Sequence, residues 1–377
     1  MARPLRMLNL SLGTGRAGSG IFAVALARKL VQLGHQVIQG CAPGSFTEIQ
    51  AEEAALPCYR VTLTSLYEFR KAKQLARYCR EEKIDVINAH HSGERYLAIF
   101  SRLLFRCPAR IILTRHAVSG TVPFFGSLIY NLGADMNIAV SRIVMQSLKR
   151  DLTFRKILIY GGIDIEKVSG QNPERIAAVT REIRERSHGI PVVGMVADYD
   201  PGGKNRRGHG KGHAVLFEAV SILKRPVFLL LVGPLPDHCE SLLSLADSFG
   251  IPREQIMVVP FQKEIAPYYY AMNMHVLPSY SESLGLVNLE AMAAGVPCIG
   301  SDIGGINEVI SDGRNGLLFA RGIAGELADR IRLLLDDAGL RKRLSETGKS
   351  DVKIRFDIAR TAKETADLCY RVVGDRH

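Results

Sequence analysis

Two glutamates in the second half of the chain have the spacing of a ligand-binding pair. Glu282 and Glu290 lie in the stretch 278–310, PSYSESLGLVNLEAMAAGVPCIGSDIGGINEVI. A helix is expected over 286–294, ended by a glycine with a proline just beyond. Glu282 then precedes the helix and Glu290 lies on its second turn. Ordinary glutamates on a capped surface helix are the alternative, but the neighbours of Glu290 are apolar, and a carboxylate in such a place usually has a partner.

The start of this helix has the chemistry of an anion site. Free backbone N–H groups at Gly285 and Leu286 combine with the helix dipole there. A diphosphate bound at this point leaves Glu290 near a ribose diol, which a carboxylate recognises by accepting two hydroxyl hydrogen bonds. Glu282 then faces whatever group the diphosphate carries.

Further polar and glycine residues follow predicted strands, where open parallel sheets bind their ligands. In the first half of the chain they are the glycine loop 13–20, His90, His91, Arg115, His116, Ser141 and the pair Gly161-Gly162. In the second half they are the segment 198–211, Gly233 with Pro234, Phe261 and the loop 279–285.

The loop GTGRAGSG at 13–20 matches the dinucleotide pattern G-x-G-x-x-G. That site also needs an acidic residue at the end of the second strand. The expected second strand ends in Gln39-Gly40-Cys41, and no acid follows before Glu48. A nicotinamide cofactor is therefore the less favoured interpretation, and an NAD-dependent oxidoreductase remains an alternative.

The composition indicates a soluble globular protein with anionic partners. The chain has 377 residues, 47% hydrophobic residues, and a formal charge of +11. A basic balance favours nucleotides, phosphorylated glycans or acidic membranes. Eleven Lys and Arg against four acids in 70–115 form either a solvated surface or a face for an anionic membrane or glycolipid. Phe124 and Phe125 are further candidates for membrane contact. Nucleic acid is not expected, since no reading motif accompanies the charge.

Neither metal binding nor a disulfide framework is expected. The seven cysteines are scattered, odd in number and without a C-x-x-C pair, which favours a reducing cytoplasm. Adjacent strand residues such as His90 and His91 point to opposite faces and rarely share an ion. His209 and His213 are four apart, but their glycine-rich surroundings argue against a helix. No apolar run reaches the length of a membrane span, and the N-terminal MARPLRMLNLSLG is interpreted as a first strand.

Strands alternate with amphipathic helices throughout, which predicts an α/β protein with parallel sheets. A polar break near 165–190 divides the chain into domains 1–168 and 169–355, and a last helical stretch, 356–377, can pack on either domain, including back on the first. The expected strands are 5–12, 36–41, 84–89, 110–114, 136–140 and 156–160, then 191–197, 227–233, 256–259, 274–278 and 296–300.

The stretch 278–310 strongly resembles the E-x7-E signature of the retaining GT-B glycosyltransferases of the group-1 class, glycosyltransferase family 4. The surrounding EAMAAGVP and SDIGGINEVI match as well. Weaker similarities follow in the family's order: LGHQV at 33–37, Ser141 after its strand, GGID at 161–164 and KGH at 211–213. The resemblance implies two Rossmann-like domains facing each other across a cleft.

The resemblance also implies roles for single residues. Glu290 would bind the ribose of a nucleotide sugar, and Glu282 the donor sugar near its 3- and 4-hydroxyls. Lys211 would neutralise the diphosphate, and His116 would lie close to the reacting carbon. The remaining expected contacts are backbone amides of Ser283, Leu284, Gly285 and Leu286, the segments at Gly233 and Phe261, the loop residues Gly18, Ser19 and Gly20 with Arg16, and His91, Arg115 and Ser141 on the acceptor side.

The sequence departs from the family pattern in two places. The arginine expected after the first strand of the second domain is absent, and Asp198 stands there instead. The segment DYDPGGKNRRGHG, with Lys204, Arg206 and Arg207, resembles an insertion, and Arg207 is favoured over Arg206 as the replacement. The second departure is Gly161, where the family often has asparagine.

We therefore expect a cytoplasmic hexosyltransferase, with peripheral attachment to the inner face of the cytoplasmic membrane as an alternative location. It would move a sugar from a nucleotide donor, of UDP type, to a lipid-linked or cell-surface polysaccharide or lipopolysaccharide acceptor with retained configuration. No cofactor and no metal are expected, because basic side chains and a helix terminus replace the metal. A non-catalytic basic adaptor on the same scaffold is a further alternative.

Overall fold

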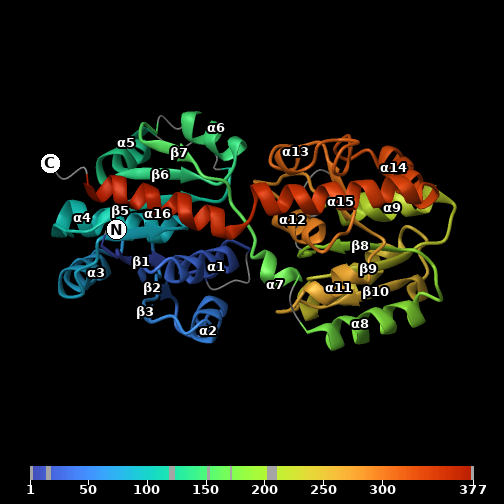
Figure 1. Cartoon of the computed structure of the whole chain (residues 1–377), viewed down its shortest axis with the longest axis horizontal. Helices are drawn as coiled ribbons and strands as arrows, with labels where there is room; N and C mark the ends of the chain where they lie inside the picture. The colour runs from blue at the N-terminus through green and yellow to red at the C-terminus, as the bar shows by residue number, and fades with distance from the viewer. Residues whose placement is uncertain are drawn as a thin grey trace. The chain divides into compact units, whose positions relative to one another are not determined.

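The computed structural model describes residues 3–13, 18–118, 124–150, 153–169, 172–201 and 210–374. The chain forms two compact units (Figure 1). The first consists of Met1–Ile163 and Phe356–His377, and the second of Asp164–Arg355. The boundary lies five residues before the expected position at 168, and the C-terminal stretch belongs to the first unit.

The first unit contains a seven-stranded sheet in the order β3-β2-β1-β4-β5-β6-β7, and every pair of neighbouring strands is parallel. Because helices cover both faces, its strands are almost continuously apolar. The strands are β1 (Arg6–Leu10), β2 (Gln36–Cys41), β3 (Cys58–Arg60), β4 (Val86–Ala89), β5 (Arg110–Arg115), β6 (Met136–Ala139) and β7 (Lys156–Leu158).

Alternate strand residues of this sheet enter different cores. Leu8 and Ile87 pack with the helices on one face, whereas Met7 and Val86 pack with the first and last helices of the chain on the other. The last helix, α16, lies along α1 (Figure 1). The helices of this unit are α1 (Gly18–Gln32), α2 (Phe46–Glu53), α3 (Phe69–Glu81), α4 (Ser92–Phe105), α5 (Phe124–Gly133), α6 (Arg142–Arg150) and α16 (Ile358–Gly374).

The second unit contains a six-stranded parallel sheet in the order β10-β9-β8-β11-β12-β13. Val193, Leu229 and Val276 belong to its largest core. The strands are β8 (Val192–Val196), β9 (Phe228–Val232), β10 (Ile256–Val259), β11 (Met274–Leu277), β12 (Cys298–Ser301) and β13 (Leu317–Phe319). The helices are α7 (Ile165–Ser169), α8 (Pro173–Arg186), α9 (His213–Leu223), α10 (Cys239–Asp247), α11 (Ala266–Tyr270), α12 (Leu286–Ala293), α13 (Ile306–Val309), α14 (Ala324–Asp336) and α15 (Ala338–Arg355), with 3-10 turns at Pro236–His238 and Arg253–Gln255.

The predicted α/β class with two parallel sheets is confirmed, and the sequence missed two strands. These are β3 and β13, each three residues long and each at a sheet edge. Three residues are too few to show a periodic pattern, and β7, which is as short, was expected only as part of the longer run 156–160. Residues 210–212, between His209 and His213, are not helical, and α9 begins only at His213, after Gly212 with its positive φ of 83°. In the described part of the chain, no helix combines the length and apolarity needed to cross a bilayer.

Candidate active site

The loop before α12 has a backbone shape that depends on two glycines. Gly285 precedes the helix with φ 78°, a left-handed conformation that favours glycine. The backbone N–H of Gly305 donates to the carbonyl oxygen of Glu282 at 3.1 Å. A Cβ on Gly305 would lie 2.2 Å from the backbone of Ser283, so only glycine allows this approach. Ser283 and Leu286 are partly exposed, while Leu284 is buried beneath them.

Lys211 and Glu282, two predicted catalytic residues, form an ion pair in the second unit. Lys211 Nζ lies 2.6 Å from Glu282 Oε1, and the hydroxyl of Ser279 donates to the same oxygen at 3.0 Å. Gly212 sets the position of the lysine, since a Cβ there would lie 2.0 Å from the carbonyl oxygen of Pro278. The structure thus brings together two side chains that the sequence separates by 71 residues.

Glu290 on α12 has the partner that its apolar surroundings predicted. The hydroxyl of Tyr269, on α11, donates to Glu290 Oε2 at 2.9 Å. Burial raises the pKa of Glu290 to about 6, and the Tyr269 hydrogen bond and the nearby charge of Lys167 oppose that rise. The phenol of Tyr269 is fully buried, and burial raises its pKa well above 10. The sequence analysis missed Tyr269, whose only signal was a tyrosine run in PYYYAMNM.

Gly233 and Phe261 follow β9 and β10 at the same carboxyl edge of the sheet. Gly233 has φ 121°, and a Cβ there would lie 2.8 Å from the carbonyl oxygen of Ala197. The N–H of Phe261 donates to the carbonyl oxygen of Pro234 at 3.0 Å. The backbone of both segments therefore lies close to the carboxyl ends of the strands, where the sequence analysis expects these residues. Lys204, Arg206 and Arg207 lie outside the described residues.

In the first unit, His91 joins the start of α1 to the start of α4. Its Nε2 lies 2.8 Å from the hydroxyl of Ser19, and its Nδ1 lies 3.0 Å from a carboxylate oxygen of Glu94. Glu94 also accepts hydrogen bonds from the backbone N–H groups of Leu12, His90 and His91. Gly18 begins α1 and is exposed. Residues 14–17, which include Arg16, lie outside the described part of the loop.

His116 is linked to the core of the first unit through His90. His90 Nδ1 lies 2.8 Å from His116 Nε2, and His90 Nε2 lies 2.7 Å from Asn9 Oδ1. Burial lowers the pKa of His116 to about 3 and that of His90 well below 6.5. Both rings are therefore neutral at pH 7. Asn9 was not predicted as a functional residue, although a polar amide side chain within an otherwise apolar strand could have indicated it.

The other two acceptor-side predictions lie in buried positions. Arg115 is 3% exposed and its guanidinium lies 5.3 Å from the centre of the Tyr130 ring. Ser141 is fully buried, and its hydroxyl accepts from the backbone N–H of Val144 at 3.4 Å. That bond caps the start of α6.

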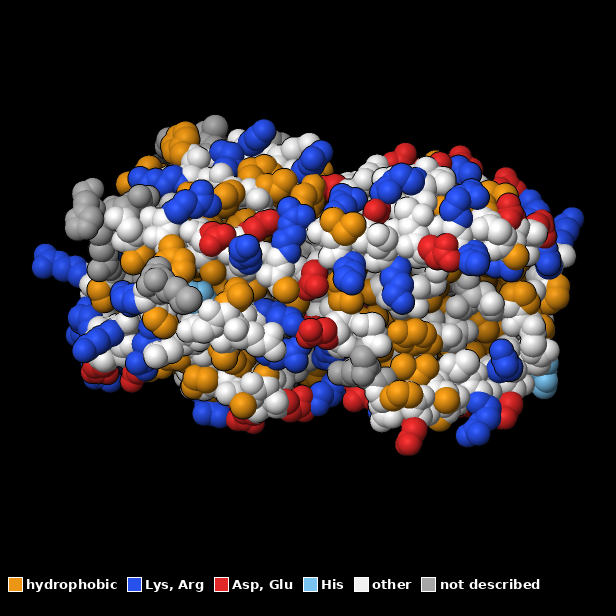
Figure 2. All heavy atoms as spheres, in the orientation of Figure 1, with side chains coloured by type: hydrophobic (Ala, Val, Ile, Leu, Met, Phe, Trp, Pro, Cys, Tyr) orange, Lys and Arg blue, Asp and Glu red, His pale blue; other side chains and the backbone are white. Residues whose placement is uncertain are grey.

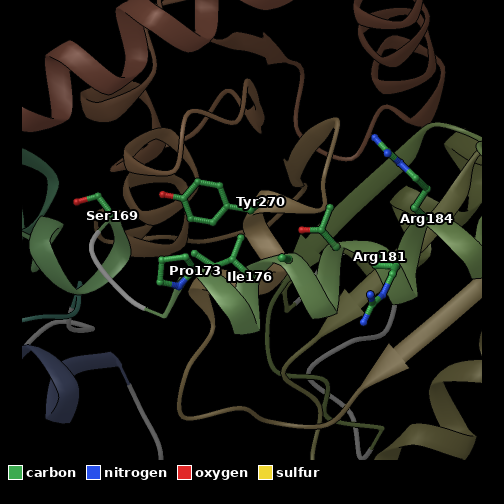
Figure 3. Close-up of a pocket in the computed structure, with 8 residues that line it drawn as sticks. Ser169, Pro173, Ile176, Arg181, Arg184 and Tyr270 are labelled. Carbon is green, nitrogen blue, oxygen red and sulfur yellow. The ribbon is translucent and has the colours of Figure 1, made fainter.

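A separate hollow lies on the face of the second unit formed by α7, α8 and α11 (Figure 3). It has a volume of about 800 Å³ and an apolar floor with Ile176 and Pro173. The hydroxyl of Tyr270 points across it toward α7, where it donates to the carbonyl oxygen of Val168 at 3.4 Å. None of the predicted site residues lines this hollow.

The described residues contain no group of three or more His, Cys, Asp or Glu side chains placed to hold a metal ion. All seven cysteines are described and carry free thiols. The chemistry that these residues offer is thus that of ion pairs, a helix N-terminus, neutral imidazoles and one carboxylate with a raised pKa.

Comparison with known proteins identifies the family of both halves. Residues 204–351 match the family described as "Glycosyl transferases group 1", and residues 16–167 match "Glycosyltransferase Family 4". The N-acetyl-alpha-D-glucosaminyl L-malate synthase of Bacillus anthracis is 25% identical over 95% of each chain. A D-inositol 3-phosphate glycosyltransferase 2 of Catenulispora acidiphila is 38% identical over 35% of this chain and 31% of its own.

A solved structure has the same fold over nearly the whole length. Anabaena Alr3699/HepE, in complex with UDP-glucose, superposes with a TM-score of 0.82 at 19% identity and covers 97% of this chain and 100% of its own. The predicted GT-B fold is confirmed by this likeness, and the match to both family models sets the NAD-dependent oxidoreductase aside. The chain belongs to the group-1 class of glycosyltransferases, glycosyltransferase family 4.

Proposed function

We propose that this chain transfers a hexosyl group from a nucleotide-sugar donor of UDP type, with retention of the anomeric configuration. The observation that carries the proposal is the hydrogen bond from Tyr269 to Glu290, which lies on the second turn of a helix whose N-terminus is suited to bind an anion. One short helix thereby offers a ribose acceptor and a diphosphate site. Two relatives support the choice: the HepE structure contains UDP-glucose, and the name of the Bacillus anthracis enzyme contains an N-acetylglucosaminyl group.

Different residues of the second unit bind different parts of the donor. The amides at 283–286 and the ammonium of Lys211 receive the diphosphate, and Glu282 accepts hydrogen bonds from sugar hydroxyls. During transfer the bond from the anomeric carbon to the diphosphate breaks, and a bond to the acceptor oxygen forms on the same face. The hydroxyl proton leaves with the nucleoside diphosphate. Lys211 and the helix start stabilise the charge that develops on the leaving group, which removes the need for a metal ion.

The acceptor is proposed to be anionic and to bind to the first unit. Arg95 and Arg115 are both at least nine-tenths buried. Burial, aided by the charge of Arg115, lowers the pKa of Arg95 to about 10. The two guanidinium groups together give this part of the first unit a positive charge. A lipid-linked or cell-surface glycan such as lipopolysaccharide fits this charge, and so do the malate and inositol phosphate in the relatives' names.

Peripheral attachment to the inner face of an acidic cytoplasmic membrane is the further part of the proposal. Leu128, Leu132 and Phe154 are exposed, and the N–H of Phe154 donates to Asn131 on α5 at 3.1 Å, so the backbone of Phe154 lies beside the helix that carries the two leucines. Lys and Arg side chains are spread over the face drawn in Figure 2, mixed with acidic ones. Co-sedimentation with vesicles containing anionic lipid, compared with neutral vesicles, tests the attachment.

The decisive experiment is a screen of nucleotide sugars for hydrolysis to nucleoside diphosphate. We expect release with at least one UDP-sugar, and loss of nucleotide binding in Glu290→Ala. A calorimetric titration in which both proteins ignore all nucleotides contradicts the proposal. NMR of the new anomeric centre distinguishes retention from inversion. Activity that persists in excess chelator supports metal independence.

A further inference from the structure

The hydrogen bonds that connect His116 to the core of the first unit allow only one assignment of donors and acceptors. Asn9 Nδ2 lies 3.0 Å from the backbone carbonyl oxygen of Ala23 and 2.9 Å from Gln39 Oε1. A backbone carbonyl can only accept. The amide nitrogen of Asn9 must therefore face Ala23, and its oxygen, Oδ1, must face His90. The side chain of Gln39 agrees, because its own amide nitrogen donates to the carbonyl oxygen of Gly40 at 2.9 Å.

This orientation of Asn9 determines where His90 carries its hydrogen. His90 Nε2 lies 2.7 Å from Asn9 Oδ1, so that nitrogen must be the donor. The oxygen of Asn88 accepts from the hydroxyl of Thr114 at 2.7 Å, and its amide nitrogen lies 3.3 Å from both Asn9 Oδ1 and His90 Nε2. Asn9 Oδ1 can only accept, so the Asn88 amide donates to Asn9, and His90 Nε2 keeps its own hydrogen for the shorter contact. A neutral imidazole has one hydrogen, so His90 Nδ1 is left as an acceptor.

The position of the hydrogen on His90 in turn determines which ring nitrogen of His116 is protonated. Its Nε2 lies 2.8 Å from His90 Nδ1, and an acceptor there requires that Nε2 carry the hydrogen. The two ring planes are within 21° of each other with centres 5.1 Å apart, which fits a bond in the plane of both rings. The edge-on contact of Phe22 with both rings keeps them in place. The low pKa values of His90 and His116 support the neutral forms.

We propose that His90 is a positioning residue that holds His116 as the Nε2–H tautomer, so that Nδ1 of His116 presents its lone pair to a hydroxyl group of the bound substrate. Asn9 and the carbonyl oxygen of Ala23 determine the donor and acceptor at each step of this series of hydrogen bonds. The tautomer is independent of the proposed function, whereas the use of the lone pair by a sugar hydroxyl rests on it.

Long-range ¹H–¹⁵N correlation spectra of ¹⁵N-histidine protein at pH 7 test the tautomer without any substrate. His116→Asn identifies the signals of His116 by their loss. We expect the neutral Nε2–H pattern for both His90 and His116 in the unmodified chain. A neutral Nδ1–H pattern or a charged ring at His116 overturns the proposal, and this result needs no variant of His90.

Two substitutions of His90 test its control over His116. His90→Phe removes the acceptor, so His116 should lose its single tautomer. His90→Gln restores the direction, because its amide group donates to Asn9 and its oxygen accepts from His116. An unchanged His116 pattern in a folded His90→Phe protein contradicts the proposal. If a nucleotide sugar is turned over, His90→Phe should lower kcat about tenfold, the value of one hydrogen bond, and His90→Gln should recover most of it.

Discussion

The ammonium of Lys211 lies 2.6 Å from the carboxylate of Glu282, and the hydroxyl of Ser279 donates to the same oxygen. The lysine side chain is 39% exposed and the glutamate 13%, so the pair lies at the surface of the second unit with its acidic member more enclosed. Without ligand, each of the two charges neutralises the other. We expect a diphosphate that pairs with the lysine to free the carboxylate, which can then accept hydrogen bonds from the donor sugar.

Lys211→Ala should lower kcat for a nucleotide sugar by about 10- to 100-fold, the range expected when one hydrogen bond to a charged group is lost. Lys211→Arg should retain more activity, since it keeps the charge. Steady-state kinetics with a fixed acceptor measure both. Lys349→Ala, an exposed lysine on α15, is the matched control and should leave kcat unchanged. Equal loss in the control variant would point to general electrostatics instead.

Glu290→Gln should weaken the binding of UDP by about 10- to 100-fold, because the charged acceptor of two hydroxyl hydrogen bonds is replaced by an amide. The hydrogen bond from Tyr269 can still form to the amide oxygen, so the fold should be kept. Isothermal calorimetry measures the affinity. Glu346→Gln, an exposed glutamate on α15, provides the comparison. Unaltered UDP affinity in Glu290→Gln would show that Glu290 does not recognise the ribose.

The affinity for UDP-glucose should fall as the pH is lowered from 7.5 through about 6. Burial raises the pKa of Glu290 to about 6, so the carboxylate takes up a proton in this range and loses its charge. Since the bound sugar nucleotide favours the ionised form, affinity follows the ionised fraction. The diphosphate diester of UDP-glucose has no group of its own that titrates there.

Two variants separate this titration from others. Glu290→Gln should abolish the fall in affinity between pH 7.5 and 5.5. Tyr269→Phe removes the hydrogen bond that favours the ionised carboxylate, so the midpoint should move to higher pH. Calorimetric titrations across this range give the profile of each protein. The same profile in wild type and Glu290→Gln would assign the pH dependence to another group.

Gly305→Ala should distort the loop that precedes α12. Its φ of −68° suits alanine, so the effect is steric alone: the new Cβ meets the backbone of Ser283 at 2.2 Å. We expect a loss of about 1–3 kcal/mol in the free energy of unfolding and weaker UDP binding. Gly325→Ala, near the start of α14, meets nothing within 4 Å and should be neutral or stabilising. Thermal melts of the two variants give the comparison, and equal Tm values would rule out the clash.

The sequence by itself determined the features that depend on neighbouring residues. Buried parallel strands are apolar runs, and α12 is marked by glycine on both sides, so the α/β class and the loop and helix carrying Glu282 and Glu290 could be recognised locally. Within the second unit, the expected positions of Gly233 and Phe261 at the strand ends follow from the same rule. The edge strands β3 and β13 were not predicted, because three residues are too few to show a periodic pattern.

The tertiary structure alone decided which distant side chains meet. In the sheet of the first unit β4 lies between β1 and β5, which pairs Asn9 with Asn88 and brings His90 next to His116. No local pattern encodes that strand order or the direction of the resulting hydrogen bonds. Lys211 with Glu282, and Tyr269 with Glu290, are joined in the same way, because their contact depends on packing between elements that are far apart along the chain.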